Sequence, residues 1–209
     1  MHDQKSNPRV VYWMGNSLYL NVTNRCSNDC YFCFRKFKNG IRDFNLKLEK
    51  EPSVDEVKKE LCKVINKKNW NEVVFCGFGE PLERLDLILE VTRWLKKQYV
   101  KTIRVDTNGH GYLLNRGREV ARELKDAGLD KISVSLNSAD KAIYNKVCKP
   151  SFENAYEMVL EFINKSLEAG LETEATAVTI SEVDIQKVKN LTERMGVKFS
   201  LRQYIPFFW

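Results

Sequence analysis

Three cysteines crowd into one short stretch of the chain and carry the strongest chemical signal in the sequence. Cys26, Cys30 and Cys33 form a C-x3-C-x2-C pattern directly after the β-type run 18–23. Three thiolates on one short loop can converge on a metal centre. Because a cubane iron–sulfur cluster usually takes four cysteines, three would leave one iron free to bind a small molecule. The pattern therefore predicts a [4Fe-4S] cluster on these residues.

The same three cysteines are open to two other interpretations. Tetrahedral zinc takes four protein ligands, or three and a water, so a zinc knuckle would borrow a distant ligand. The histidines His2 and His110 are the obvious candidates, and neither has a helpful spacing. Plain reduced thiols are the second alternative.

The other cysteines, Cys62, Cys76 and Cys148, are scattered and show no ligand pattern. We expect them to be buried reduced thiols rather than a second cluster. Residues 1–10 contain no apolar stretch typical of a secretory signal. This favours a reducing cytoplasm, where a tight cysteine group indicates a metal site more than disulfides.

Composition indicates one globular core. The chain has 209 residues, 43% of them hydrophobic and 30% charged, with a net charge of +6. We expect a single domain over 1–209, with an N-terminal extension at 1–16 and an apolar tail at 205–209. No apolar run approaches the ~20 residues that span a bilayer. The basic excess is modest and lacks a Lys/Arg block, so nucleic-acid binding is left open.

Strand patterns alternate with helical patterns along the whole chain. The predicted strands are 18–23, 72–76, 102–106, 131–136, 172–180 and 197–204. The predicted helices are 53–68, 83–97, 115–127, 140–147, 152–169 and 184–195. Such alternation predicts an α/β fold with a parallel sheet, and six units are too few for an eight-fold barrel. Either an open doubly wound sheet or a partial (β/α)6 TIM-like barrel with a parallel six-stranded sheet fits.

The parity of the strands favours the partial barrel. Helix crossovers cover both sides of an open parallel sheet, so its strands read as continuous apolar runs. Here one face is polar in several strands. The polar positions include Tyr19, Asn21, Ser133, Ser135, Glu174, Thr176, Ser200, Arg202 and Tyr204. We expect this face to line a concave interior that holds a polar ligand.

The strand followed by C-x3-C-x2-C resembles the radical S-adenosylmethionine (SAM) superfamily. Gly79-Glu80-Pro81 looks like the Gly-Gly-Glu-Pro loop of that family, with Phe78 in place of its first glycine. Thr107-Asn108-Gly109 is similar to its Thr-Asn-Gly loop. Each landmark follows a predicted strand, at the end of the sheet where ligands of parallel α/β folds bind.

The resemblance implies further cofactor contacts. Phe32 corresponds to an aromatic position against the adenine, and backbone groups from Phe78 to Glu80 would receive the methionine amino group. Ser135 and Asn137 resemble the polar positions near the ribose and carboxylate, and Val178 is the candidate for an apolar adenine contact. The resemblance thus implies that Cys26, Cys30 and Cys33 hold the cluster and that the loops around them hold SAM.

The resemblance also implies an activity. In this family the cluster reductively cleaves SAM to a 5′-deoxyadenosyl radical, which abstracts hydrogen from a substrate. A one-electron reductant of flavodoxin or ferredoxin type is the implied partner. Arg202 and Tyr204 are the candidate substrate contacts. The sequence identifies neither the substrate nor a catalytic side chain.

A narrower resemblance is to the radical SAM proteins associated with TatD-type hydrolases. It rests on the stretches 75–82 and 144–152 and on Arg202-Gln-Tyr204, and it implies a TatD-type partner. Three alternatives remain: a glycyl-radical activating enzyme, a deazapurine-forming enzyme, and a non-catalytic metal-binding or electron-transfer module. The last would need no SAM pocket.

Overall fold

A computed structural model describes residues 7–204 as a three-layer arrangement of strands, helices and a long N-terminal loop. The strands are β1 (Val11–Met14), β2 (Ser17–Leu20), β3 (Gly40–Ile41), β4 (Phe44–Asn45), β5 (Glu72–Phe75), β6 (Ile103–Thr107), β7 (Lys131–Ser135), β8 (Glu172–Val178) and β9 (Lys198–Arg202). The α-helices are α1 (Val54–Cys62), α2 (Leu85–Lys97), α3 (Gly111–Leu114), α4 (Val120–Ala127), α5 (Lys141–Cys148), α6 (Ala155–Glu168) and α7 (Ile185–Arg194). The short 3-10 helices are η1 (Phe34–Lys36) and η2 (Pro81–Arg84).

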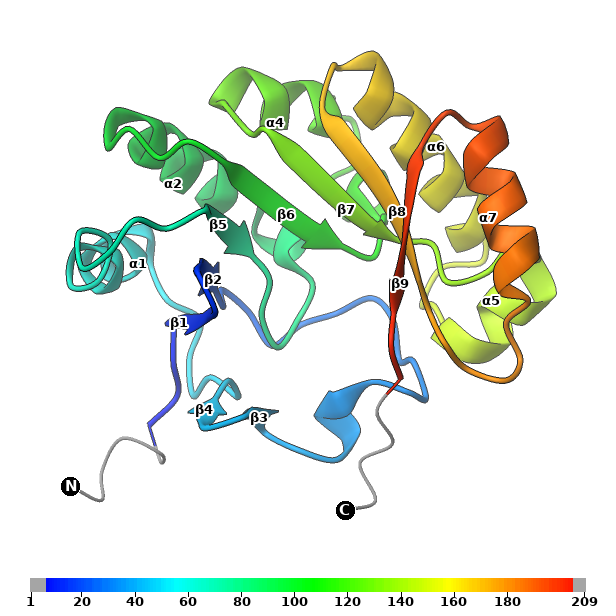
Figure 1. The fold of residues 1–209 in the computed structure, drawn as a ribbon, viewed down its shortest axis with the longest axis horizontal. Helices are drawn as coiled ribbons and strands as arrows, with labels where there is room; N and C mark the ends of the chain where they lie inside the picture. Colours follow the sequence, from blue (N-terminus) through cyan, green and yellow to red (C-terminus); the bar gives the residue numbers. More distant parts are fainter. Residues whose placement is uncertain (1–6, 205–209) are drawn as a thin grey trace.

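The main sheet has the order β1-β2-β5-β6-β7-β8-β9. From β2 to β9 all neighbouring strands are parallel and follow one another in chain order. Figure 1 shows these strands as an arc with the helices on its outer side. The segment after β2 runs across the inner side towards β9 before returning to the β3–β4 hairpin. The predicted α/β fold with a partial TIM-like barrel is confirmed.

The sheet has one strand more than the prediction. Residues 11–14, expected to belong to an extension, form β1, which pairs antiparallel with β2. The two are joined by Gly15-Asn16, with Gly15 at φ 56°, a two-residue connection of the kind that hairpins use. That dipeptide was a usable signal, because Gly-Asn between two apolar runs is a hairpin pattern. The tail 205–209 lies outside the described residues.

Helix boundaries follow local capping chemistry. Ser53 and Glu56 form the capping box that starts α1, and Asp140 and Asp184 cap α5 and α7 through their side chains. Helix α1 ends at Cys62, earlier than expected. The indole of Trp70 donates to the Val64 carbonyl at 3.1 Å in the turns that follow, which takes an acceptor that a longer helix would use.

The two faces of the sheet differ as the strand parity predicted. Leu18, Leu20 and Ile132 are fully buried in the core shared with the helices. On the other face, the Ser133 and Ser200 hydroxyls donate to Glu174 at 2.8 and 2.9 Å. The helices cover the apolar face, so the polar face is the concave one.

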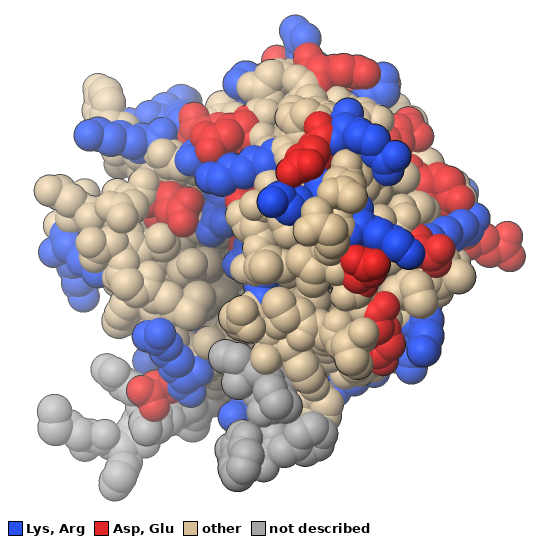
Figure 2. Space-filling view, turned by 45° about the vertical axis from the view of Figure 1, so that its right-hand side comes forward, with Lys and Arg blue, Asp and Glu red and all other residues tan. Residues whose placement is uncertain are grey.

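Charges of both signs are mixed on the face of the molecule drawn in Figure 2. On this face, Lys and Arg side chains lie among Asp and Glu and form no patch of one sign. This arrangement does not favour a nucleic-acid interface there. Among residues 7–204, no helix combines the length and apolarity needed to cross a bilayer.

Candidate cluster and cofactor site

The loop that carries Cys26, Cys30 and Cys33 follows β2, with Cys26 six residues past Leu20, and it is fastened to the end of α5. The Asp29 N–H donates to the Cys148 carbonyl at 3.1 Å, and the Tyr31 N–H donates to the Val147 carbonyl at 3.2 Å. A β-bridge joins Asn28 to Pro150. These bonds fix the backbone around Cys30 against α5 and leave the loop little freedom.

The three thiols of this loop are free, and each is partly buried. The Arg35 Nε donates to Cys33 Sγ at 3.3 Å, and the Asn108 Nδ2 lies 3.8 Å from Cys26 Sγ. The Cys148 thiol lies beside that of Cys30 and raises its pKa. Within residues 7–204, no three side chains from among His, Cys, Asp and Glu gather as ligands of a single metal ion. The three sulfurs therefore do not converge in this arrangement.

The donor set fits an iron–sulfur cluster. Three thiols lie on one loop, and N–H donors already reach two of the sulfurs, as is usual around such clusters. Burial raises the pKa of Cys26 to about 12, so this sulfur is protonated on its own. Bound iron would reverse that preference, because a coordinating thiol loses its proton. Zinc would need a fourth protein ligand or a water, and His110, the candidate within the described residues, is held by other partners.

His110, one of the candidate zinc ligands, has another role. It is fully buried, and its ring nitrogens lie 2.8 Å from Ser27 Oγ and 2.9 Å from Tyr144 Oη. Burial lowers its pKa to about 4, so the ring is neutral. His110 therefore braces the cysteine loop against α5. The other candidate, His2, lies outside the described residues.

The Gly-Phe-Gly-Glu loop after β5 packs directly on the start of the cysteine loop. The Gly79 N–H donates to the Thr23 carbonyl at 2.9 Å, and the Glu80 N–H donates to the Arg25 carbonyl at 2.7 Å. A Cβ on Gly79 would lie 2.2 Å from the Arg25 oxygen. Glycine is required here because two backbones touch.

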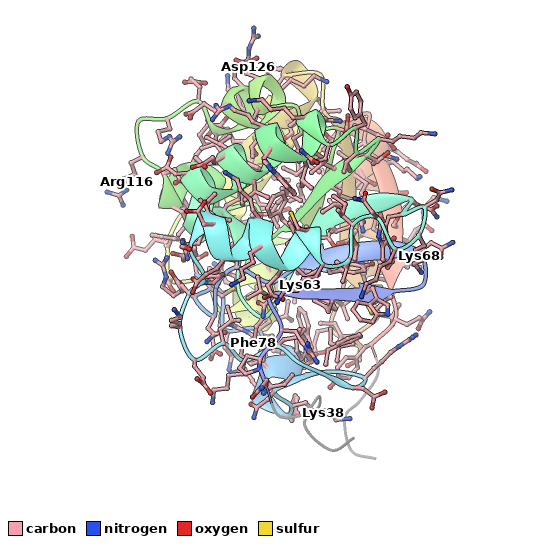
Figure 3. All side chains as sticks on the ribbon, turned by 90° about the vertical axis from the view of Figure 1, so that its left-hand side faces the viewer. Lys38, Lys63, Lys68, Phe78, Arg116 and Asp126 are labelled. Atoms are coloured by element: carbon pink, nitrogen blue, oxygen red, sulfur yellow. The ribbon has the colours of Figure 1, made fainter. Side chains whose placement is uncertain are left out.

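The Phe78 side chain packs in a small hydrophobic cluster with Tyr12 and Leu46. Its ring packs edge-on against Phe34 at 5.7 Å between centroids, with the Arg35 guanidinium 5.8 Å from its centre. Figure 3 shows Phe78 between the β1–β2 strands and the layer that holds η1, β3 and β4. The Phe78 N–H donates to the Asn21 Oδ1 at 3.0 Å. Asn21, which the sequence did not single out as a site residue, thus fixes this loop.

Glu80 connects the loop after β5 to the loop after β6. Its carboxylate accepts hydrogen bonds from the Leu82 N–H at 3.0 Å, the Thr107 hydroxyl at 2.7 Å and the Asn108 N–H at 2.7 Å. Burial raises the pKa of Glu80 to about 7, and the three hydrogen bonds oppose this rise. The Asn108 amide reaches Ser27 at 2.9 Å. The side chains of all three predicted cofactor contacts are therefore occupied by protein partners.

Two further predicted contacts, Ser135 and Asn137, lie at the carboxyl end of β7. Ser135 is the register partner of Thr176. Asn137 adopts φ 58° and is buried, and its Oδ1 has no hydrogen-bond partner among the described residues. Its Nδ2 reaches Cys148 Sγ at 3.5 Å. An orphaned buried acceptor beside the cysteine loop is what a polar cofactor would satisfy.

The remaining predicted contacts lie nearby. Phe32 packs edge-on against Tyr31 with 5.6 Å between centroids. Val178 is the register partner of Arg202, and both are partly exposed. The Tyr204 N–H donates to Thr179 Oγ1 at 2.9 Å. Val178 and Arg202 lie at the carboxyl ends of β8 and β9, and Tyr204 follows two residues later.

The concave face holds a charged network below these loops. Arg104 lies 3.3 Å from Asp106 and 3.2 Å from Glu72, and Arg202 lies 3.6 Å from Asp106. Arg202 is the more exposed of the two arginines, with 48% of its side chain accessible against 14%. The structure thus gives Arg202 an ion pair while leaving half of its side chain open to the interior.

The three cysteines outside the loop differ in how far they are buried. Cys148 is fully buried, as expected. Cys76 is partly buried, and this burial raises the pKa of its thiol. Cys62 is exposed, so the expectation of burial is wrong for it. It ends α1, and the face that this helix buries carries Val57 and Leu61 instead.

The sequence of this chain matches a known protein family and several curated proteins. The profile described as "Radical SAM superfamily" matches residues 20–195. A Methanococcus aeolicus protein named "Probable GTP 3',8-cyclase" is 31% identical over 195 residues, covering 91% of this chain and 60% of that protein. A Saccharolobus solfataricus protein of the same name is 32% identical over 154 residues, covering 74% and 44%. This chain therefore spans about 60% or less of the length of these relatives.

Solved structures show the same fold. Streptococcus suis SuiB bound to S-adenosylmethionine aligns with a TM-score of 0.71 at 15% identity, covering 97% of this chain and 42% of SuiB. Native anSMEcpe with bound AdoMet aligns with a TM-score of 0.66 at 17% identity, covering 90% and 50%. Since the family profile spans most of the chain, the chain belongs to the radical SAM superfamily, and this membership implies a [4Fe-4S] cluster and SAM as its cofactors.

Proposed function

We propose that this chain cleaves SAM reductively at a [4Fe-4S] cluster held by Cys26, Cys30 and Cys33. When bound, the two cofactors supply a 5′-deoxyadenosyl radical that abstracts hydrogen from a substrate. The observation that carries the proposal is the joining of three loops at the carboxyl ends of β2, β5 and β6. Glu80 holds two of them and its own N–H holds the third.

The hydrogen bonds of the loop after β5 indicate which of its groups can contact SAM. The N–H groups of Phe78, Gly79 and Glu80 are all taken by protein acceptors, so this loop offers an incoming amino group its carbonyl oxygens. The side chains of Glu80, Thr107 and Asn108 act by positioning these loops.

Direct contact with SAM is proposed for four residues on the other side of the site. These are Phe32, Ser135, Asn137 and Val178, each of them partly exposed or, for Asn137, carrying an unpaired acceptor. The aromatic rings of Tyr31, Phe32 and Phe34 lower the polarity next to the cysteines, which helps to exclude water from the reacting groups.

The substrate is proposed to enter from the concave face and to meet Arg202 and Tyr204. The relatives named for GTP suggest a purine nucleoside triphosphate as the first compound to test. Within residues 7–204, however, this face sets Glu72, Asp106 and Glu174 against Arg104 and Arg202. That balance leaves no surplus positive charge for a triphosphate, so GTP is a test compound rather than our proposed substrate.

Partners and location are proposed from the chemistry of the site. The cluster needs a one-electron reductant, for which a flavodoxin or ferredoxin is suitable. Free thiols at the site favour a reducing compartment such as the cytoplasm. Association with a TatD-type hydrolase rests on the sequence stretches alone, because the relatives reported above are named for another reaction. Residues 1–209 are proposed to form one core domain.

The proposal is tested by anaerobic reconstitution with iron and sulfide, followed by SAM and dithionite. We expect a [4Fe-4S] spectrum and 5′-deoxyadenosine, detected by mass spectrometry. Cys26→Ser should lose both signals. Cys62→Ser is the matched control, because Cys62 is exposed on α1, and it should keep both.

Each alternative has its own outcome. A clustered protein that binds SAM and never yields 5′-deoxyadenosine would make the chain a non-catalytic module. Saturation of the thiols by zinc with no assembly of iron would contradict the cluster itself. Transfer of the radical to a glycine of a partner protein would identify a glycyl-radical activating enzyme, by the electron paramagnetic resonance signal of that radical.

A further inference from the structure

Cys148 is a buried thiol that the proposed reaction does not use, yet it lies against a proposed cluster ligand. The backbone bonds from Asp29 and Tyr31 to residues 147 and 148, at 3.1 and 3.2 Å, place Cys30 beside Cys148. The bridge between Asn28 and Pro150 extends this pairing by one further step. The two cysteines therefore sit on neighbouring backbones that are held together independently of their side chains.

The side chains complete this relationship. The Cys30 and Cys148 thiols are neighbours. Cys148 is fully buried and its sulfur also faces the Asn137 amide at 3.5 Å. Adjacent paired backbones bring Cα atoms within the range that a disulfide spans without backbone movement. Among the described residues, the sulfurs of the other two cysteines face nitrogen donors: Cys33 faces Arg35, and Cys26 faces Asn108.

We propose that Cys30 and Cys148 are a disulfide-forming pair, and that their disulfide and the iron–sulfur cluster exclude one another. Oxidation would come from a low-molecular-weight disulfide such as oxidised glutathione. The Cys30 thiol gives up its proton as its sulfur attacks one glutathione sulfur, and the first glutathione is released. The Cys148 sulfur then attacks Cys30 and releases the second. Two protein thiols become one disulfide, and one glutathione disulfide becomes two glutathione thiols, which take up the two protons.

The consequence for the cluster depends on the proposed function, whereas the pairing does not. If Cys30 is a ligand, the disulfide removes one of three sulfurs and iron cannot be held. A thioredoxin-type reductant would return both thiols, so the loop would be protected from irreversible oxidation while it carries no cluster.

The test uses the whole chain, stripped of metal with a chelator and incubated with oxidised glutathione. Non-reducing digestion with Asp-N protease and chymotrypsin isolates Cys30, because Asp29 and Tyr31 flank it. Mass spectrometry should then find a Cys30–Cys148 cross-link as the main disulfide. A main cross-link between Cys30 and Cys33, or glutathione adducts without a cross-link, would overturn the proposal.

Two variants and one further sample sharpen the result. Cys148→Ser should leave glutathione attached to Cys30, whereas Cys62→Ser should form the cross-link as the unchanged chain does. Chain already loaded with the cluster should resist cross-linking. If the loaded chain cross-links as readily as the stripped chain, the pair stands but Cys30 is no cluster ligand, which contradicts the proposed function instead.

Discussion

The Thr107 hydroxyl donates a 2.7 Å hydrogen bond to the Glu80 carboxylate and so joins the loops after β5 and β6. The same carboxylate receives the Asn108 N–H at 2.7 Å. Glu80 is 3% exposed, so it acts inside the protein and not on a ligand in solvent. The Gly79–Glu80 loop, which resembles a cofactor-binding motif, therefore also holds two loops of the protein together.

Replacing Glu80 by Gln should loosen this joint. The new amide would place a donor against the Asn108 N–H, or else against the Leu82 N–H, and an unmade buried hydrogen bond costs about 1–3 kcal/mol. We expect the free energy of unfolding at pH 7 to fall by about that amount, measured by urea denaturation. Thr107→Ser is the matched control, because it keeps the hydroxyl, and it should lose less.

The pH dependence of stability provides a separate check on Glu80. Its pKa is raised to about 7 in the folded chain by burial, so folding favours the protonated acid. Its contribution is therefore present at pH 4.5 and is lost as the pH rises through 7, by about 2 kcal/mol between pH 5 and 8. Glu80→Gln should remove this fall. An unchanged pH profile in the variant would contradict the assignment.

Gly79→Ala should displace the loop that carries Glu80. The added Cβ would lie 2.2 Å from the Arg25 oxygen and 2.7 Å from the Thr23 oxygen. Both are backbone atoms, so the loops must separate, and such overpacking costs about 1–3 kcal/mol or more. We expect loss of SAM binding by the reconstituted protein, measured by equilibrium dialysis.

The control for this substitution is Gly117→Ala. Gly117 has open space around it and φ 76°, so alanine there costs about 1–2 kcal/mol of backbone strain without touching the site. It should lower the melting temperature and keep SAM binding. Retained SAM binding in Gly79→Ala would show that contact between the two loops is not needed.

Much of this architecture could be predicted from the sequence because its signals are local. Alternating apolar residues gave the strands, and Ser53-x-x-Glu56 gave the start of α1. The polar face was visible because strand parity repeats every two residues. The Gly79–Glu80 and Thr107–Asn108 loops were recognisable because each follows its own strand.

The interactions between these loops could not be predicted in the same way. Asn21 and Phe78 are distant in the sequence, as are Cys30 and Cys148, and no periodic pattern connects them. The role of His110 could not be predicted from residue spacing, because its partners Ser27 and Tyr144 are far from it in the sequence. The hydrogen bonds that join Glu80 to Thr107 and Asn108 are visible only in the folded structure.

His110 should make the cysteine loop sensitive to acid. Burial lowers its pKa to about 4, so folding favours the neutral ring. The stability it contributes is present above pH 6.5 and is lost as the pH falls towards 4, by about 2 kcal/mol between pH 7 and 5. This trend is opposite in sign to that of Glu80, so the unchanged chain shows only their difference.

His110→Gln isolates the histidine contribution. Glutamine keeps a donor and an acceptor but does not titrate in this range. We expect the urea midpoint of the variant to rise between pH 7 and 5, because only the Glu80 contribution then remains, whereas the midpoint of the unchanged chain should change little. The double variant with Glu80→Gln should again change little. If the pH profile of His110→Gln matches that of the unchanged chain, His110 does not contribute.

Arg35 should set the properties of the bound cluster. Its Nε reaches Cys33 Sγ at 3.3 Å, and its other nitrogens hold the carbonyls of Asn24 and Asn28 at 3.0 and 3.4 Å. A cation beside the sulfurs favours the reduced, more negative cluster. Arg35→Gln should therefore shift the midpoint potential negative, on the order of tens of millivolts, measured by redox titration.

Two further variants separate the charge of Arg35 from its hydrogen bonds. Arg35→Lys keeps the charge but loses the fork of donors, so it should retain most of the potential while loading iron less completely. Arg122→Gln removes a charge on α4 that pairs with Asp126 at 3.2 Å, and it should change neither quantity. Equal potentials in Arg35→Gln and the unchanged chain would show that the guanidinium holds the loop without acting on the cluster.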